Sequence, residues 1–195
     1  MQCVHRHSWR GRIRSFRADS FASIVFQLRD ARSRALWAMQ KITPFLWFDN
    51  QAEEAANFYC SVFKNSKVKE KTYYTGAEPV GKKGSVMTVV FELNGQEFVA
   101  LNGGPQFKFT EAISFSIDCE RQEEIDYYWE KLTSGGGEEV QCGWLADKYG
   151  LSWQVVPANF SKWAKDPAGF QRVMQTLMPM KKLDMATLQQ AFDGE

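Results

Sequence analysis

The chain has 195 residues, of which 44% are hydrophobic and 24% are charged, as in ordinary soluble globular proteins. This composition excludes wholesale disorder, collagen and coiled coils, and the length allows one domain or two small modules. No run approaches the ~20 consecutive apolar residues that a membrane span requires, so we expect no membrane partner. Aromatic residues make up 14% of the chain, enough for a sizeable core.

The net charge of +1 averages two unlike segments. Residues 1–38 contain eight Arg and two acidic residues, a net charge of +6, whereas residues 39–195 have a net charge of −5. An acidic body does not favour nucleic-acid binding, which depends on Lys and Arg neutralising phosphates. Four widely spaced Cys with no CxxC pair indicate reduced thiols in a cytoplasmic protein.

Residues 1–38 are interpreted as an appendage. Their Arg-rich, Ser-rich and acid-poor composition is typical of an organelle transit peptide. Met39, however, directly precedes the first clean strand, which favours an upstream translation of a chain that begins at Met39. A disordered tail and a folded, functional arm are the remaining alternatives. Arg clusters can bind anionic partners, but the segment specifies none.

In residues 41–104, apolar and polar residues alternate as they do in strands, and one segment has the spacing of an amphipathic helix. Asp49 and Asn50 are expected to cap that helix, and the Asn94-Gly95 pair is a strong two-residue hairpin signal. The expected order is therefore βαβββ, with a strand at 41–48, a helix at 51–63 and strands at 67–75, 85–93 and 96–101.

Residues 111–157 repeat this order. We expect a strand at 111–118, a helix at 121–132 and short strands at 138–142, 144–148 and 151–156. An internal repeat of about 70 residues predicts two similar modules. Each four-stranded half-sheet alone would leave one face bare, so the two modules side by side are expected to enclose a cup lined by alternate strand residues.

Residues 158–195 are expected to form a helical arm after the 39–157 domain. Apolar residues recur at helical spacing around a break at 167–169, and a short final helix is expected at 183–192, where Asp184 can cap it. Such an arm packs either on its own body or on a second subunit.

Four strings resemble the PhnB-like branch of the vicinal oxygen chelate superfamily, which includes glyoxalase I, extradiol dioxygenases and bleomycin-resistance proteins. They are ITPFLWFDNQAEEAANFYCSVF at 42–63, LNGGPQFKF at 101–109, GWLADKYGLSWQVVP at 143–157 and MPMKKLDMATLQQAF at 178–192. The resemblance implies an α+β fold of paired βαβββ modules and a homodimer. Members often carry the label 3-demethylubiquinone 3-methyltransferase domain, but one fold hosts many chemistries.

Metal-dependent members of the superfamily place His, Glu or Gln on four strands that face the cup, where a divalent ion polarises substrate oxygens. The resemblance puts these positions at Thr43, at Ala100 or Asn102, at Ala112 and at Gln154. Neutral hydroxyl and amide oxygens are poor sole ligands for transition metals, and residues 39–195 contain no His. We therefore expect neither a metal nor another cofactor in the cup.

The methyltransferase label points to S-adenosylmethionine, which such enzymes usually bind with a Gly-rich loop after the first strand. Here the first expected strand is followed by residues 48–51, FDNQ, which contain no Gly. The Gly103-Gly104 pair precedes a Pro and is interpreted as a turn. The label is therefore not expected to describe the chemistry of this chain.

Residues expected on the cup face form an apolar, aromatic pocket with a few neutral polar groups, the kind that binds flat or apolar small molecules. The candidate ligand-binding residues are Thr43, Phe45, Trp47, Asn102, Trp144, Ser152 and Gln154. The first hypothesis is a metal-free protein that binds a small apolar or aromatic molecule. The alternatives are an enzyme on a small oxygenated substrate (a lyase, a dioxygenase or a 3-demethylubiquinone-type methyltransferase), a dimeric interaction module, and a collapsed cup in which the aromatics are core.

Overall fold

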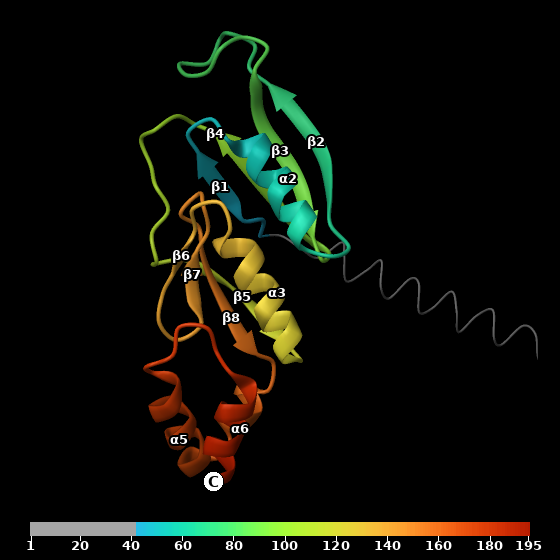
Figure 1. The fold of residues 1–195 in the computed structure, drawn as a ribbon. Coiled ribbons are helices and arrows are strands. Elements are labelled where there is room, and N and C mark those ends of the chain that lie inside the picture. The colour runs from blue at the N-terminus through green and yellow to red at the C-terminus, as the bar shows by residue number, and fades with distance from the viewer. Residues whose placement is uncertain (1–41) are drawn as a thin grey trace, which may run out of the picture. The chain divides into compact units, whose positions relative to one another are not determined.

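The computed structural model describes residues 42–195, of which Thr43–Glu195 form one compact unit (Figure 1). The interpretation of residues 1–38 as an appendage lies outside the described residues. No helix in the described part of the chain is long and apolar enough to span a membrane.

The first module has the expected βαβββ order. Its sheet has the strand order β1-β4-β3-β2, in which β1 is parallel to β4 and the other neighbours are antiparallel. Its elements are β1 (Phe45–Phe48), α2 (Ala52–Val62), β2 (Lys67–Tyr73), β3 (Val86–Leu93) and β4 (Gln96–Asn102).

The second module repeats this topology. Its sheet has the order β5-β8-β7-β6, again with the first strand parallel to the last and the others antiparallel. The paired βαβββ modules predicted from the sequence are therefore confirmed. Its elements are β5 (Ser114–Cys119), α3 (Gln122–Thr133), β6 (Glu138–Glu139), β7 (Trp144–Ala146) and β8 (Ser152–Pro157).

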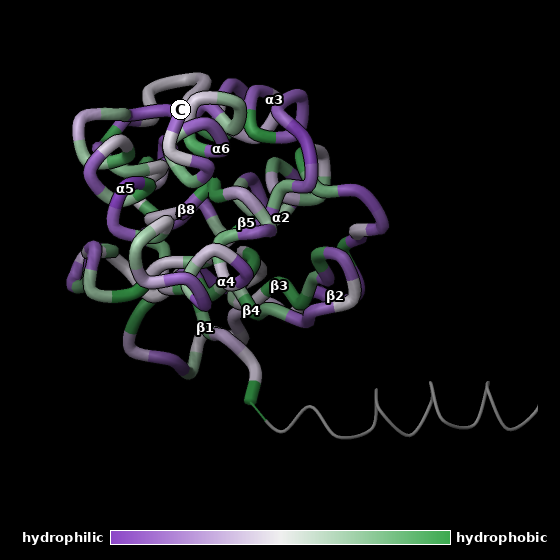
Figure 2. Tube along the Cα trace, turned by 90° about the horizontal axis from the view of Figure 1, so that it is seen from below, coloured by the Kyte–Doolittle hydropathy of each residue, from purple (hydrophilic) through white to green (hydrophobic). Residues whose placement is uncertain are grey.

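One helix covers one face of each sheet. The buried residues of α2 recur at helical spacing and pack on β2, β3 and β4, whereas α3 packs on β5, β7 and β8. Figure 2 shows hydrophobic residues along the inner strand β3 and hydrophilic residues along the edge strand β2. At the β3–β4 hairpin, Asn94 and Gly95 both have positive φ, the conformation that a type I′ turn requires.

The N-terminus of α2 is capped from a distance rather than by its own neighbours. The prediction that Asp49 and Asn50 cap this helix is wrong, because no side chain of the preceding segment accepts from its first amides. Instead, Asn102 Oδ1 accepts from Ala52 N at 2.7 Å, and Asn102 Nδ2 donates to Val86 O at 3.0 Å. The last residue of β4 thereby fixes both α2 and the start of β3.

Three further helices follow the second module and pack mainly on one another. Asp166 caps α5 and, as predicted, Asp184 caps α6. The segment that joins them runs beside β7, where Cys142 N donates to Met180 O and Gly143 N donates to Lys181 O. The helices are α4 (Phe160–Trp163), α5 (Pro167–Leu177) and α6 (Met185–Asp193).

A buried carboxylate joins the two modules. Asp147, in the β7–β8 turn, is only 3% exposed. Its Oδ2 accepts from Tyr59 Oη of α2 at 2.8 Å and from Trp153 Nε1 of β8 at 2.9 Å. Its Oδ1 accepts from the backbone amides of Tyr149 and Leu151. Burial raises the pKa of Asp147 above its ordinary value, and these four hydrogen bonds oppose the rise.

We expect Asp147→Asn to lower the free energy of unfolding by about 2 kcal/mol, the cost of a buried donor without an acceptor. The amide nitrogen of Asn would face either the indole of Trp153, which can only donate, or two backbone amides. Urea unfolding of the variant and wild type measures the difference. Asp126→Asn, which removes an exposed partner of Lys182, is the control and should cost about 0.5 kcal/mol. Equal losses in the two variants would contradict the assignment of Asp147 as the inter-module joint.

Candidate functional site

Each sheet has a second face that its own helix does not cover, which we call the open face. On β1 the residues of the open face are Phe45, which is 59% exposed, and Trp47, whereas Leu46 and Phe48 are buried toward α2. On β8 the same alternation leaves Gln154 and Val156 on the open face. Phe45, Trp47 and Gln154 thus lie on the faces predicted from strand alternation.

Two sequence-based placements on β4 are wrong. Ala100 and Asn102 do share one face, as alternation requires, but it is the helix-covered face: Ala100 is fully buried and Asn102 binds the start of α2. Leu101 and Val99 take the open-face positions instead.

Two other placements also differ from expectation, and a third residue lies on its expected strand but is buried. Thr43 precedes β1, and Ala112 lies in the turn before β5, so neither lies on a strand. Ser152 does lie on β8, but it is only 3% exposed and therefore offers little surface to a ligand.

Trp144 and Gln154 are brought together. They are direct cross-strand partners on β7 and β8. They lie in a groove of about 410 Å³ between the open face of the second sheet and helices α4 and α5, which we call the arm groove. Its walls are Ser116, Asp118, Cys142, Trp144, Gln154, Val156, Pro157, Ala158, Phe160, Ser161, Met174 and Leu177.

Two polar groups of the arm groove can accept a hydrogen bond from a ligand. Gln154 Nε2 donates to Ser114 Oγ at 2.8 Å, which leaves Gln154 Oε1 without a hydrogen-bond partner among the described residues. Asp118 is exposed and forms no ion pair with residues 42–195; Ser116 Oγ donates to it at 3.5 Å. The opposite wall is apolar, with Phe160, Met174 and Leu177 among its residues. The groove is thus suited to an apolar body that carries a hydrogen-bond donor or a positive charge.

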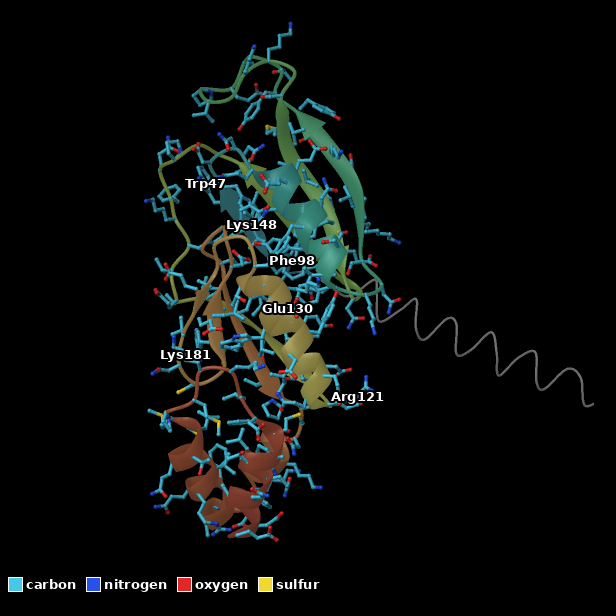
Figure 3. The ribbon with its side chains drawn as sticks, in the orientation of Figure 1. Trp47, Phe98, Arg121, Glu130, Lys148 and Lys181 are labelled. Atoms are coloured by element: carbon cyan, nitrogen blue, oxygen red, sulfur yellow. The ribbon has the colours of Figure 1, made fainter. Side chains whose placement is uncertain are left out.

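The other candidates lie elsewhere, so one chain does not bring all seven to a single cavity. Trp47 borders a hollow of about 330 Å³ with Phe107, Phe109 and Tyr149, and Figure 3 shows Trp47 and Lys148 at this end of the first module. Asn102 borders a third hollow, beside the start of α2.

Trp47 itself is held by the loop after β4. Its Nε1 donates to Gly104 O at 2.8 Å, and its ring meets Phe107 edge to face at 5.0 Å. A Cβ atom on Gly103 would overlap the indole ring. The loop therefore needs Gly at position 103 because the indole lies against its backbone.

The helical arm contributes groove residues that the sequence does not predict. Phe160, Met174 and Leu177 were expected only as packing residues of a terminal helix. Their helical spacing was the available signal, but nothing in the sequence links them to Gln154. Of the thiols, burial raises the pKa of Cys119 to about 12 and also raises that of Cys60, so both remain protonated.

A transition metal does not fit the positions that the superfamily resemblance suggests. The amide groups of Asn102 are used by α2 and β3, and Gln154 is hydrogen-bonded to Ser114. Among the described residues there is no group of three His, Cys, Asp or Glu that could hold a metal ion. A hydroxyl and amide donor set of this kind is weak for such ions.

The Gly103-Gly104 loop does not fit S-adenosylmethionine either. A nucleotide-binding Gly loop must keep its amides free for the ligand. Here Gly103 N donates to Phe48 O and Gly104 N donates to Asp49 O, while Gly104 O accepts from Trp47. All three groups are occupied by the protein's own backbone and side chains.

Comparison with known proteins identifies the family. A family model described as 3-demethylubiquinone-9 3-methyltransferase matches residues 40–156. The chain belongs to this family. The match ends within β8, so α4, α5 and α6 lie outside it. A search of the curated proteins finds no match to this chain.

Among solved structures, the PhnB protein from Bacillus cereus is 42% identical and has a TM-score of 0.55, covering 61% of this chain and 100% of that one. Its description also names a 3-demethylubiquinone-9 3-methyltransferase. The predicted PhnB-like branch and the paired-module fold are thereby confirmed.

Two fosfomycin resistance proteins are more distant. The one from Listeria monocytogenes, solved with Mn(II) and sulfate, is 17% identical with a TM-score of 0.42, covering 61% of this chain and 90% of that one. The one from Mesorhizobium loti is 10% identical with a TM-score of 0.46, covering 66% and 100%. At these values the two proteins indicate nothing about the activity of this chain.

We expect Gly103→Ala to lower the free energy of unfolding by about 2 kcal/mol, because the added methyl group displaces the Trp47 indole from a packed loop. In a Trp47→Ala background the same change should cost about 0.5 kcal/mol, since the clash is gone; a double-mutant cycle by chemical unfolding measures this coupling. Equal costs in both backgrounds would show that the indole does not rest on Gly103.

Proposed function

We propose that this protein binds a small apolar or aromatic molecule in the arm groove, without a metal ion. The observation that carries the proposal is the pairing of Trp144 and Gln154 on the open face of the second sheet, opposite the apolar wall from α4 and α5. A flat ring can pack between the indole and that wall. Gln154 Oε1 can accept a hydrogen bond from the ligand.

The negative charge of the arm groove favours some ligands over others. Asp118 is the charged residue of its lining, and the remaining polar side chains are a Gln, two Ser and a thiol. A molecule with an amine or a cationic group is therefore preferred over an anion. The three described Cys are free thiols, which supports the proposal that the protein works in the reducing cytoplasm.

We expect a thermal-shift panel on the full chain to respond to 1-aminonaphthalene, and not to Mn²⁺, Zn²⁺ or S-adenosylmethionine. At ~100 times its dissociation constant, a ligand stabilises the folded state by ~2.7 kcal/mol. Trp144→Ala and Gln154→Ala should abolish or reduce the shift, because each removes one wall contact.

Gln175→Ala, an exposed change on α5 outside the groove lining, is the control for that panel and should leave every shift intact. A shift with a metal ion that Gln154→Ala removes would overturn the metal-free proposal. If the wild type turns over a panel compound and Gln154→Ala does not, the protein is an enzyme rather than a binding protein.

We also propose that the protein is a homodimer. In the single chain, the open face of the first sheet exposes Phe45 beside Val99, its register partner on β4. Apolar groups on this face gain free energy when a second copy covers them. The expected mass in solution is therefore twice that of the 22.4 kDa chain.

Phe45→Asp should convert the dimer into a monomer, because it places a charge in the centre of the proposed contact. Size-exclusion chromatography with light scattering measures the mass of each variant. Val140→Asp changes an exposed apolar residue between β6 and β7 of the second module and should remain dimeric. A monomeric wild type, or loss of the dimer in both variants, would refute this interface.

A further inference from the structure

Another hollow lies where the two modules meet, outside the arm groove. It has a volume of about 550 Å³, within the range of small-molecule sites, and we call it the inter-module hollow. The end of α2 and the β3–β4 hairpin form one side, and β5 and α3 form the other. Neither Trp144 nor Gln154 borders it.

The floor of the inter-module hollow is aromatic. Phe63 stacks on Tyr128 at 5.3 Å between ring centroids, and its ring also lies 5.3 Å from that of Trp153. Phe98 meets Phe115 edge to face at 5.2 Å. Figure 3 shows Phe98 in the middle of the molecule, between the two modules. Ring faces and edges at such spacing are suited to receive one more planar ring.

The rim carries two opposite charges on opposite walls. Lys64, just after α2, forms no ion pair with the residues that the structure describes. Asp118, on β5, also lacks an ion-pair partner there. Lys64 belongs to the first module and Asp118 to the second, so each module contributes one charged residue to the lining of the hollow.

A neutral hydroxyl completes the polar groups. The Tyr128 hydroxyl makes no hydrogen bond with other described residues, and burial raises the pKa of this phenol, so it stays protonated. The side-chain amides of Asn65 and Asn94 are at the rim and likewise make no hydrogen bonds within residues 42–195. Donors therefore gather on the Lys64 side, and the anionic acceptor is on the β5 side.

We propose that the inter-module hollow binds a zwitterionic aromatic molecule of amino-acid size. Its ring packs on the Phe63–Tyr128–Phe115 floor, its carboxylate is held by Lys64 and the neighbouring Asn amides, and its ammonium group is held by Asp118. This site is independent of the proposed function of the arm groove, although Ser116 and Asp118 border both.

The test titrates the full chain with L-phenylalanine, 3-phenylpropionate and 2-phenylethylamine, following the intrinsic tryptophan fluorescence of the protein and heat release. L-phenylalanine should bind about tenfold more tightly than either analogue, because each analogue loses one charged hydrogen bond. Equal affinity of all three would show that the rim charges play no part. No binding of L-phenylalanine at about 10 mM, a concentration that fills even millimolar sites, would overturn the proposal.

Two variants test separately which wall binds the carboxylate and which wall binds the ammonium group. Lys64→Ala should weaken L-phenylalanine and 3-phenylpropionate about tenfold and leave 2-phenylethylamine unchanged. Asp118→Asn should weaken L-phenylalanine and 2-phenylethylamine and leave 3-phenylpropionate unchanged. Tyr128→Phe retains the ring and should change the affinity for each ligand less than Lys64→Ala or Asp118→Asn does.

Lys67→Ala, on the exposed start of β2, is the matched control and should have no effect, because it does not border the hollow. Gln154→Ala separates the two proposals: it should leave L-phenylalanine binding intact even where it abolishes binding in the arm groove. Loss of L-phenylalanine binding in Gln154→Ala would place the ligand in the arm groove and refute the inter-module site.

Discussion

The Asp147 carboxylate, with its four donors, is the constraint on which the arrangement of this protein depends. Two of the donors come from the carboxylate's own turn, one from β8 and one from α2 of the other module. A buried charge is tolerated only when it is so satisfied. The turn, the last strand and the first helix must therefore adopt their positions together. Since Gln154 follows Trp153 directly in β8, this joint also fixes the side of the sheet on which Gln154 lies.

Because the βαβββ unit is repeated, each sheet has one open face. The two open faces differ in what covers them. The open face of the second sheet is partly covered by α4 and α5. These helices follow the segment that matches the family model. The open face of the first sheet still exposes Phe45. The scaffold is common to the family, whereas the apolar wall of the arm groove comes from outside the matched segment.

The sequence was sufficient for the elements and their order, because strand alternation, helical spacing and the Asn94-Gly95 turn are local signals. It was insufficient wherever a residue acts over distance. Asn102 could not be recognised as the cap of α2, since fifty residues separate the hydrogen-bonded groups. The same contact explains the error on β4: alternation correctly paired Ala100 with Asn102, but only the position of α2 decides which face they occupy. The sheet side of the arm groove could be predicted, because its residues follow strand alternation. The helical side could not, because it depends on tertiary packing.

The two consecutive positive φ values at Cys142 and Gly143 turn the backbone amides of both residues toward the segment after α5, where Met180 and Lys181 accept them. These two hydrogen bonds tie the start of β7 to the segment between α5 and α6. Gly adopts a positive φ without steric cost, whereas Cys142 does so against the preference of an L-residue. The placement of α5, and with it one wall of the arm groove, therefore rests on a locally unfavourable backbone conformation at Cys142.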